Sequence, residues 1–302
     1  MRILWSEYRD PAANAALEEQ LYRADAGSGP VLLFYRNDNA VLFGRNQNPW
    51  QECHVSWCRR HGISLLRRIS GGGAVYHDAG NLNYAFILPR AAYDPDRYLG
   101  LIIAALRQAG LPEVSQSPHF SLWCSQRKIA GTAFALNSRT ALLHGCILVH
   151  TDPGRLHAAL QTPPGWECQS SGVASVRVPV TTMAEHLPGI TTAAVARLIA
   201  EHAQGGKNAV AMEIIPASSR DQDSAFLAFQ EKFRSDAWTY ERTADFTLKI
   251  PCPAGLLNLG ITQGRIRRAV LHSSSRITDL PMLQGCPLTI PEDQLLALVK
   301  AI

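Results

Sequence analysis

A glycine-rich stretch constrains this chain more than any other part of its sequence. It runs from Arg67 to Asn81 and places two arginines shortly before three consecutive glycines, Gly71 to Gly73. Glycine has no β-carbon, so a ligand can approach the backbone closely and several N–H groups can point at one anion. Arginine adds fixed charge and forked donors that suit phosphate or carboxylate. The stretch therefore predicts a cradle for an acidic group, with a glycine hairpin and two solvated arginines as the alternative.

Two common phosphate-binding motifs are excluded by the residues that follow the glycines. A P-loop requires Lys and then Ser or Thr directly after its last glycine, whereas Ala74 and Val75 follow Gly73. A dinucleotide-binding fingerprint requires a further glycine that opens a helix, and Tyr76 stands at that place. The stretch is therefore neither a P-loop nor a Rossmann motif.

Size and composition indicate an ordinary globular protein. A length of 302 residues suits one large domain and a small one, and no apolar run reaches the ~18 residues of a membrane span. The segment from Met1 to Trp5 lacks the long apolar region of a signal peptide, so we expect a cytoplasmic protein without a membrane partner. The net charge of +4 is mild, and the basic cluster from Arg265 to Arg268 is interpreted as a solvated strand edge. No nucleic-acid partner is expected.

The cysteines predict neither disulfides nor a zinc site. There are seven of them, an odd number, and none forms a Cys-x-x-Cys pair. Buried, reduced thiols are expected. Cys146 is a candidate nucleophile because it lies near the residues of the candidate site.

Predicted helices and strands mix irregularly along the chain. Helices are expected at 12–26, 96–109, 152–160, 193–203, 224–233 and 291–302, and strands at 63–69, 82–88, 140–150, 210–215, 246–250, 256–261 and 266–272. The apolar runs 31–35 and 40–43 predict a β-hairpin, and the Pro-, Gly- and Ser-rich segment 161–175 a long loop that could act as a lid. Because strict βαβ alternation is missing, we expect an α+β fold.

Several motifs together resemble the lipoate–protein ligase A family. They are the glycine-rich stretch extended to Asn83, the segments Lys128 to Ala133 and His144 to Cys146, and the two upstream segments Asn14 to Glu19 and Gly44 to Trp50. The resemblance covers most of residues 1–250. The glycine stretch and its flanks are long and specific. The order and spacing of the other motifs strengthen the resemblance further.

The resemblance implies a fold, a reaction and partners. The fold is a biotin/lipoate-ligase-type mixed-sheet catalytic domain with helices, expected at 1–234, then a linker at 235–243 and a small α+β accessory domain at 244–302. The implied reaction activates lipoate with ATP and Mg²⁺ as lipoyl-AMP and transfers the lipoyl group to a lysine of a carrier domain. Known carriers are the E2 subunits of 2-oxoacid dehydrogenases and the glycine-cleavage H protein.

The resemblance also assigns residues to the two substrates. The family's nucleotide contacts fall on Arg68, Gly73, Ala74, Val75, Tyr76 and Lys128. The lipoate pocket falls on Glu18, Tyr35, Arg68, Ser70, His77 and Lys128.

The chemistry gives an independent reason for a lysine in this site. Formation of an acyl-adenylate brings a carboxylate against the α-phosphate, and a cation between the two anions stabilises the charge that develops at phosphorus. Lys128 is the expected catalytic residue. A base for the acceptor lysine is not identified. His77 is one candidate, and the alternative is a structural His77 paired with Asp78 or with a backbone group. His144 is open in the same way.

The chain departs from the family pattern in two places. Ser121 stands where the family usually has an Asp, no acidic residue lies between Glu113 and Asp152, and the C-terminal region is short. The magnesium ligands are therefore left unassigned. Three hypotheses follow: an ATP-dependent ligase, an ATP-independent lipoyl or octanoyl transferase whose covalent version would use Cys146, and a non-catalytic lipoate-binding regulatory protein.

Overall fold

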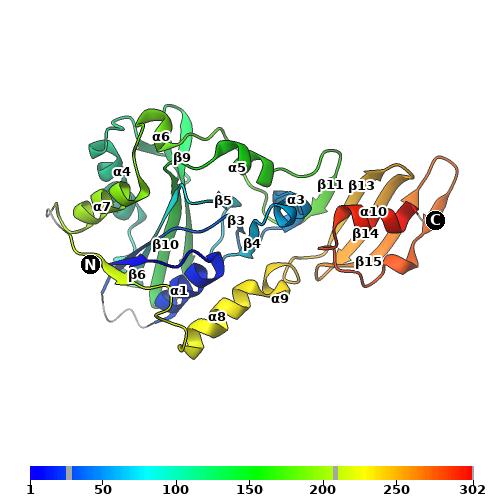
Figure 1. The fold of residues 1–302 in the computed structure, drawn as a ribbon, viewed down its shortest axis with the longest axis horizontal. Coiled ribbons are helices and arrows are strands. Elements are labelled where there is room, and N and C mark those ends of the chain that lie inside the picture. Colours follow the sequence, from blue (N-terminus) through cyan, green and yellow to red (C-terminus); the bar gives the residue numbers. More distant parts are fainter. Residues whose placement is uncertain (25–28, 207–209, 301–302) are drawn as a thin grey trace.

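An eight-stranded mixed sheet forms the centre of the larger part of the molecule (Figure 1). The computed structural model describes residues 1–24, 29–206 and 210–300. The strand order is β12 (Glu213–Ile215), β1 (Arg2–Ser6), β2 (Val31–Tyr35), β6 (Asn81–Pro89), β10 (Thr140–Leu148), β9 (Arg127–Leu136), β8 (Leu122–Cys124) and β7 (Ser115–Gln116). Only β1 pairs in parallel, with β2 and β12, and the other neighbours are antiparallel. The expected α+β class is confirmed.

Both faces of this sheet are covered by helices. Helices α4 (Pro95–Gln108) and α7 (Thr192–Ala203) cover one face, and α1 (Pro11–Arg23) and α8 (Ser224–Arg234) cover the other. Alternation along β6 sends Phe86 to the first core and Ile87 to the second. Side chains cap the helices as their sequences suggest, with Thr191 at the start of α7 and Asp10 at the start of α1.

A second, three-stranded sheet carries the glycine turn. Its strand order is β4 (Ser64–Arg67), β3 (Ala40–Phe43) and β5 (Val75–His77), with the short helices α2 (Pro49–Glu52) and α3 (Val55–Arg60) between β3 and β4. The predicted hairpin of 31–35 with 40–43 is wrong, because β2 and β3 belong to different sheets. Both strands are buried on both faces, so their apolar runs do not reveal the partner of either.

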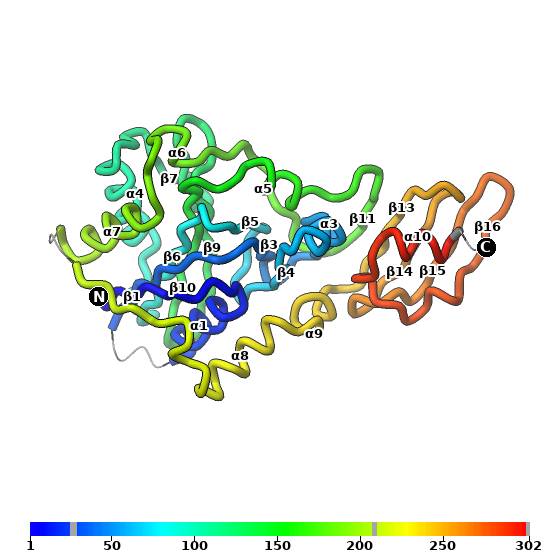
Figure 2. Tube along the Cα trace, viewed as in Figure 1, coloured from blue at the N-terminus to red at the C-terminus, as the bar shows by residue number. Residues whose placement is uncertain are grey.

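The C-terminal part is a five-stranded antiparallel sheet with one helix. Its order is β11 (Glu167–Ser170), β13 (Phe246–Cys252), β14 (Gly255–Thr262), β15 (Arg265–His272) and β16 (Ile277–Asp279), and α10 (Glu292–Lys300) packs on it. Figure 2 places this sheet at one end of the long axis. The prediction of an uninterrupted loop at 161–175 is wrong, since β11 pairs with β13. The remaining short elements are α5 (Pro153–Ala159), α6 (Met183–His186), α9 (Asp236–Thr239), and the 3-10 turns η2 (Arg90–Ala92) and η3 (Pro281–Leu283).

Aromatic side chains join the C-terminal sheet to the larger part. The ring of Trp50 in α2 stacks on Phe246 of β13 at a centroid distance of 5.4 Å and lies 5.5 Å from the ring of Tyr240. These rings belong to one buried apolar cluster that continues into the C-terminal sheet. Within the described ranges, no helix has the length and apolar character needed to cross a membrane. The domain limits proposed from the sequence stay a prediction.

Candidate functional site

A cavity of about 410 Å³ opens beside the glycine turn. Four parts of the molecule form most of its wall: the turn and β5, the neighbouring strands β9 and β10, the helix α5 (Pro153–Ala159), and a segment that we call the strap, residues 173–180, which follows β11. Its lining includes Glu52, Ala74, Val75, Tyr76, Lys128, Ala130, Gly131, Cys146, Leu148, Leu156, His157, Leu160 and Ser175 to Val180. Four of the predicted nucleotide contacts, Ala74, Val75, Tyr76 and Lys128, thus share one cavity.

Lys128 brings a positive charge to this cavity from β9. Its backbone is tied to the strap, because its N–H donates to the carbonyl of Pro179 at 2.9 Å and its carbonyl accepts the N–H of Thr181 at 3.0 Å. Its side chain lies beside Gly131, where a β-carbon would be 3.5 Å from Nζ, an ordinary van der Waals contact. Burial lowers the pKa of Lys128, and the nearby Arg68 acts in the same direction. Among the described residues no carboxylate forms an ion pair with Lys128. Its charge is therefore available to an anionic ligand in the cavity.

Cys146 lines the same cavity from β10, opposite Gly131 in the register of β9 and β10. Burial raises the pKa of its thiol, although the charges of Lys128 and Arg68 act to lower it. The neutral thiol is therefore favoured over the reactive thiolate.

Arg68 donates most of its hydrogen bonds to the glycine turn itself. Its Nε donates to Oγ of Ser70 at 3.0 Å, one terminal nitrogen to the carbonyl of Leu42 at 2.9 Å, and the other to the carbonyls of Gly71 and Gly73 at 2.6 and 2.8 Å. Burial lowers its pKa to about 10, which leaves it charged near neutral pH. Arg68 therefore holds the shape of the turn around the cavity rather than lining it.

Arg67 points away from the cavity. It donates to carbonyls of the loop 44–47 and to those of Trp238 and Thr239, and Nε1 of Trp238 donates to the carbonyl of Arg67 at 2.6 Å. The expectation that both arginines serve an anion is wrong for Arg67, because backbone carbonyls occupy its donors. Arg67 instead ties the glycine turn to α9, inside the predicted linker.

Ser175 docks the strap onto the glycine turn. Its Oγ accepts the N–H of Ala74 at 2.9 Å and a side-chain N–H of Gln47 at 3.0 Å, and its own N–H donates to Oε1 of Glu52 at 3.2 Å. Sequence reasoning missed Ser175 and Glu52 as site residues. Gln47 does lie in the segment Gly44 to Trp50, one of the motifs that carry the resemblance.

A chain of buried polar side chains runs behind the turn. The hydroxyl of Tyr35 donates to Glu18 at 3.2 Å, the Glu18 carboxylate lies 2.8 Å from Nδ1 of His144, and Nε2 of His144 lies 2.6 Å from Oγ of Ser70. Ser70 in turn accepts from Arg68. The chain brings together four residues assigned to lipoate by the resemblance, and His144 is the link between them. Burial and the neighbouring Glu18 raise the pKa of Tyr35 well above its ordinary value.

His77 lies close to this chain but has a different partner. Its Nδ1 is 3.0 Å from the side-chain nitrogen of Asn37. The structural pairing of His77 with Asp78 is wrong, because the Asp78 carboxylate accepts backbone N–H groups of Gly80 and Asp152 at 2.8 and 3.0 Å. Burial, with the charges of Arg68 and His144, lowers the pKa of His77 to about 3. The imidazole is neutral near pH 7.

Comparisons with known proteins identify the family and the fold of the chain. The family model of the lipoyl protein ligase A/B catalytic domain matches residues 10–204. The P. falciparum LipL1 structure in complex with lipoate has a TM-score of 0.67 at 20% identity, over 98% of this chain and 88% of that one. A lipoate-protein ligase A bound with ATP has a TM-score of 0.64 at 24% identity, over 79% and 97%.

A third similar structure comes from an archaeal lipoylation system of Thermoplasma acidophilum, described as a bi-partite lipoate protein ligase and its E2 lipoyl domain. Its TM-score is 0.64 at 24% identity, over 79% of this chain and 96% of that one. These identities show a shared fold. The family match covers more than half of the chain and shows more: the protein is an enzyme that belongs to the lipoyl protein ligase A/B catalytic-domain family.

Proposed function

We propose that the protein is an ATP-dependent lipoate–protein ligase. In the first step the lipoate carboxylate attacks the α-phosphate of ATP, so that lipoyl-AMP forms and pyrophosphate leaves. In the second step a lysine amine of a carrier domain attacks the acyl carbon, the amide bond forms, and AMP leaves. The observation that carries the proposal is the unneutralised, half-buried charge of Lys128 in the cavity beside the glycine turn.

Lys128 has the properties that the first step needs. Two anions must approach each other, and a fixed cation in a partly desolvated cavity stabilises them more strongly than the same cation in water. Its backbone is held by hydrogen bonds to Pro179 of the strap and to Thr181, and its side chain lies beside Gly131, so little reorganisation accompanies the reaction. We assign Lys128 as the catalytic residue that contacts both the carboxylate and the phosphate.

The two substrate sites follow from the positions around Lys128. We assign Gly73, Ala74, Val75 and Tyr76 to the nucleotide, with Arg68 shaping the turn that presents them. We assign Glu18, Tyr35, Ser70 and His77, behind that turn, to the lipoate side. The titles of two similar structures, one bound with ATP and one in complex with lipoate, support a site for both ligands in this fold.

Magnesium would enter as part of the nucleotide substrate. Among the described residues, no group of three or more His, Cys, Asp or Glu side chains is placed to hold a metal ion, and Glu52 is the carboxylate in the cavity lining. Mg²⁺ commonly binds through one or two carboxylates together with substrate phosphates. The donor set fits a metal carried by ATP and does not fit a resident metal site.

The acceptor is proposed to be a lipoyl carrier domain, such as an E2 subunit or the glycine-cleavage H protein. The archaeal ligase described with its E2 lipoyl domain supports this class of partner. The strap residues Val176 and Arg177 are exposed and line the cavity, so its mouth is open to an incoming lysine.

An ATP-independent acyl transferase is the second candidate, because Cys146 lines the cavity near Lys128. In that reaction the Cys146 thiolate would attack an acyl thioester, forming an acyl-cysteine while the donor thiol departs with the proton of Cys146. The acceptor amine would then attack the acyl carbon, so that the amide bond forms and the Cys146 thiol is released. Burial raises the pKa of Cys146 and opposes thiolate formation. The ligase is therefore the better-supported function.

One experiment separates the two functions. In one incubation the enzyme receives a carrier domain, lipoate and magnesium, with and without ATP. In a second incubation a preformed acyl donor, a lipoyl or octanoyl thioester, replaces lipoate and no ATP is added. The mass of the carrier is measured in each. We expect lipoylation only with ATP, and the same result with Cys146→Ala. Acyl transfer from a preformed donor without ATP, lost in Cys146→Ala, would replace the ligase by the transferase.

A further inference from the structure

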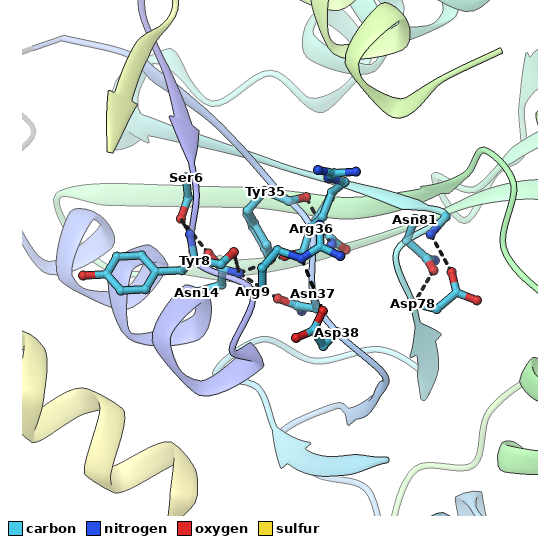
Figure 3. Close-up of polar contacts among 12 residues, drawn as sticks. Ser6, Tyr8, Arg9, Asn14, Tyr35, Arg36, Asn37, Asp38, Asp78 and Asn81 are labelled. Atoms are coloured by element: carbon cyan, nitrogen blue, oxygen red, sulfur yellow. Dashed lines mark hydrogen bonds and ion pairs between the residues drawn. The ribbon is translucent and has the colours of Figure 1, made fainter. Parts of the chain in front are cut away.

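A network of buried amide side chains lies between α1 and the turn that joins β2 to β3. Figure 3 shows its centre, with Ser6, Asn14 and Asn37 joined by hydrogen bonds. All three side chains are buried, Asn14 and Asn37 completely. Buried amides are costly unless their donors and acceptors are all matched, so the pattern of partners determines which way each amide faces.

The orientation of Asn14 is fixed by backbone carbonyls. Its Nδ2 lies 2.9 Å from the carbonyl oxygen of Tyr8 and 3.2 Å from that of Arg36, and both of these atoms can only accept. Its Oδ1 lies 2.8 Å from Oγ of Ser6, which itself accepts the N–H of Tyr8 and so has its hydroxyl proton free to donate. Reversing the amide would set oxygen against two carbonyls.

The orientation of Asn37 follows from that of Asn14. The side-chain oxygen of Asn37 lies 2.9 Å from Nδ2 of Asn14, and the reverse orientation would set two N–H₂ groups against each other at that distance. The amide nitrogen of Asn37 therefore faces Nδ1 of His77 at 3.0 Å. An amide nitrogen can only donate, so Nδ1 must carry the lone pair. The proton of the neutral imidazole is on Nε2.

Nε2 of His77 is left as a donor without a partner. The side chain is 4% exposed, and within the described ranges Nε2 makes no hydrogen bond to the protein. The charged and titratable groups close to the ring are Arg68, which follows β4, and His144 on β10. Both disfavour a second proton on His77. Nε2 is not fully enclosed by protein atoms, so a ligand atom can reach this neutral N–H and accept a hydrogen bond from it.

We propose that His77 donates a hydrogen bond from Nε2 to the acyl substrate, and that Asn37 is the positioning residue that fixes this tautomer. The inference rests on the proposed function for the identity of the ligand and on the amide network for the position of the proton. It also gives His77 a definite role in the reaction. A group whose Nε2 already holds the proton cannot take one from the acceptor lysine, so His77 binds substrate and is not the general base.

The tautomer can be measured without any assay of activity. In ¹⁵N-labelled protein, a protonated and an unprotonated imidazole nitrogen have well-separated chemical shifts, and the spectrum of His77→Asn identifies which of the ten histidines is His77. We expect Nε2 of His77 to be protonated, with no titration between pH 5 and 8. An Nδ1–H tautomer, or a titration in that range, would overturn the inference.

Substitution of Asn37 tests its positioning role. In Asn37→Asp the carboxylate accepts from Nδ1–H, so the His77 proton moves to Nδ1 and Nε2 becomes an acceptor. We expect the dissociation constant for lipoate to rise about tenfold, the effect of one lost hydrogen bond. Asn39→Asp is the matched control, because it adds the same charge to the same turn and its side chain contacts the Tyr76 hydroxyl instead.

The outcomes separate this inference from the proposed function. If Asn37→Asp moves the proton while lipoate binds as tightly as in the wild type, His77 does not donate to the acyl substrate, and the inference is wrong even though lipoyl-AMP still forms. If the wild type forms no lipoyl-AMP but lipoate shifts the Nε2 signal of His77, the inference holds and the ligase assignment fails. Should Asn37→Asp not fold, the wild-type spectrum and its response to lipoate decide the matter.

Discussion

Oγ of Ser175 lies 2.9 Å from the backbone nitrogen of Ala74 and accepts its N–H, which joins the strap to the glycine turn. The strap is held at both ends. It follows β11, which pairs with β13 in the C-terminal sheet, and its other end forms a bridge between Val180 and Lys128. The wall of the cavity is therefore tied to the C-terminal sheet through β11. A change in that sheet has a direct path to the proposed nucleotide site.

The docking of the strap leads to a first prediction. Ser175→Ala removes the acceptor for Ala74 and the side-chain contact with Gln47, and leaves the bond from its N–H to Glu52 in place. We expect the KM for ATP to rise about fivefold, corresponding to ~1 kcal/mol for the lost contacts, with the fold unchanged. Steady-state kinetics with varied ATP measure this.

A matched control is available in the same segment. Ser170→Ala removes a hydroxyl that accepts the N–H of Gly172 and does not touch the glycine turn. An equal rise in KM for both variants would show that the contact with Ala74 has no particular importance for the nucleotide.

The close approach of β9 and β10 leads to a second prediction. A β-carbon at Gly145 would lie 2.1 Å from the carbonyl oxygen of Gly131 and 2.5 Å from the hydroxyl oxygen of Tyr84. Because backbone atoms cannot give way cheaply, we expect Gly145→Ala to lower the free energy of unfolding by roughly 3 kcal/mol or more. Urea denaturation measures the loss.

Gly100 provides the comparison for that measurement. It lies in the interior of α4, and a β-carbon there would meet nothing within 4 Å. Gly100→Ala is expected to raise the free energy of unfolding by about 0.5–1 kcal/mol, since alanine is the better helix former. A Gly145→Ala variant as stable as Gly100→Ala would contradict the strand spacing described above.

The pKa of His77 leads to a third prediction, on stability in acid. Burial lowers this pKa from its ordinary value of 6.5 to about 3. Below pH 6.5, His77 therefore binds a proton in the unfolded chain, whereas in the native state it stays neutral until about pH 3. The contribution of neutral His77 to the free energy of unfolding is lost as the pH falls through this window. The slope approaches about 1.4 kcal/mol per pH unit for one such group.

The variant His77→Asn isolates that contribution. Asparagine keeps an acceptor for the Asn37 amide but does not titrate, so the free energy of unfolding should fall less between pH 7 and pH 5 than in the wild type. Urea denaturation at the two pH values gives the difference, with the exposed His150→Asn as control. Equal losses in the wild type and in His77→Asn would mean that His77 titrates alike in both states.

Local patterns in the sequence predicted much of the fold but not all strand partners. Helix α7 and its cap at Thr191 follow from spacing and residue type. The partner of β2 does not, because its side chains are buried on both faces and alternation carries no information. Strand β11 was missed for a related reason: four residues in a Pro- and Gly-rich segment gain their order from β13, nearly eighty positions later.

The sequence predicted several of the residues that lie around the glycine turn, but not the contacts that each of them makes. Arg67 and Arg68 are adjacent and chemically equal in the sequence, yet one contacts α9 and the other builds the glycine turn. Similarly, His77 and Asp78 are neighbours that suggest a pair, but His77 ends β5 while Asp78 begins the turn that follows, and each has a different partner. Tertiary contacts decide these roles, and no local pattern records them.

The central claim is that Lys128 stabilises the reacting carboxylate and phosphate. The most direct test measures lipoyl-AMP formation by purified enzyme with lipoate, ATP and magnesium, in the wild type, in Lys128→Ala and in the control Lys249→Ala, whose lysine pairs with Glu167 in the C-terminal sheet. We predict lipoyl-AMP in the wild type and in Lys249→Ala, and a loss of about 10²–10³-fold or more in Lys128→Ala with the fold retained. A rate in folded Lys128→Ala equal to that of the wild type would contradict the account.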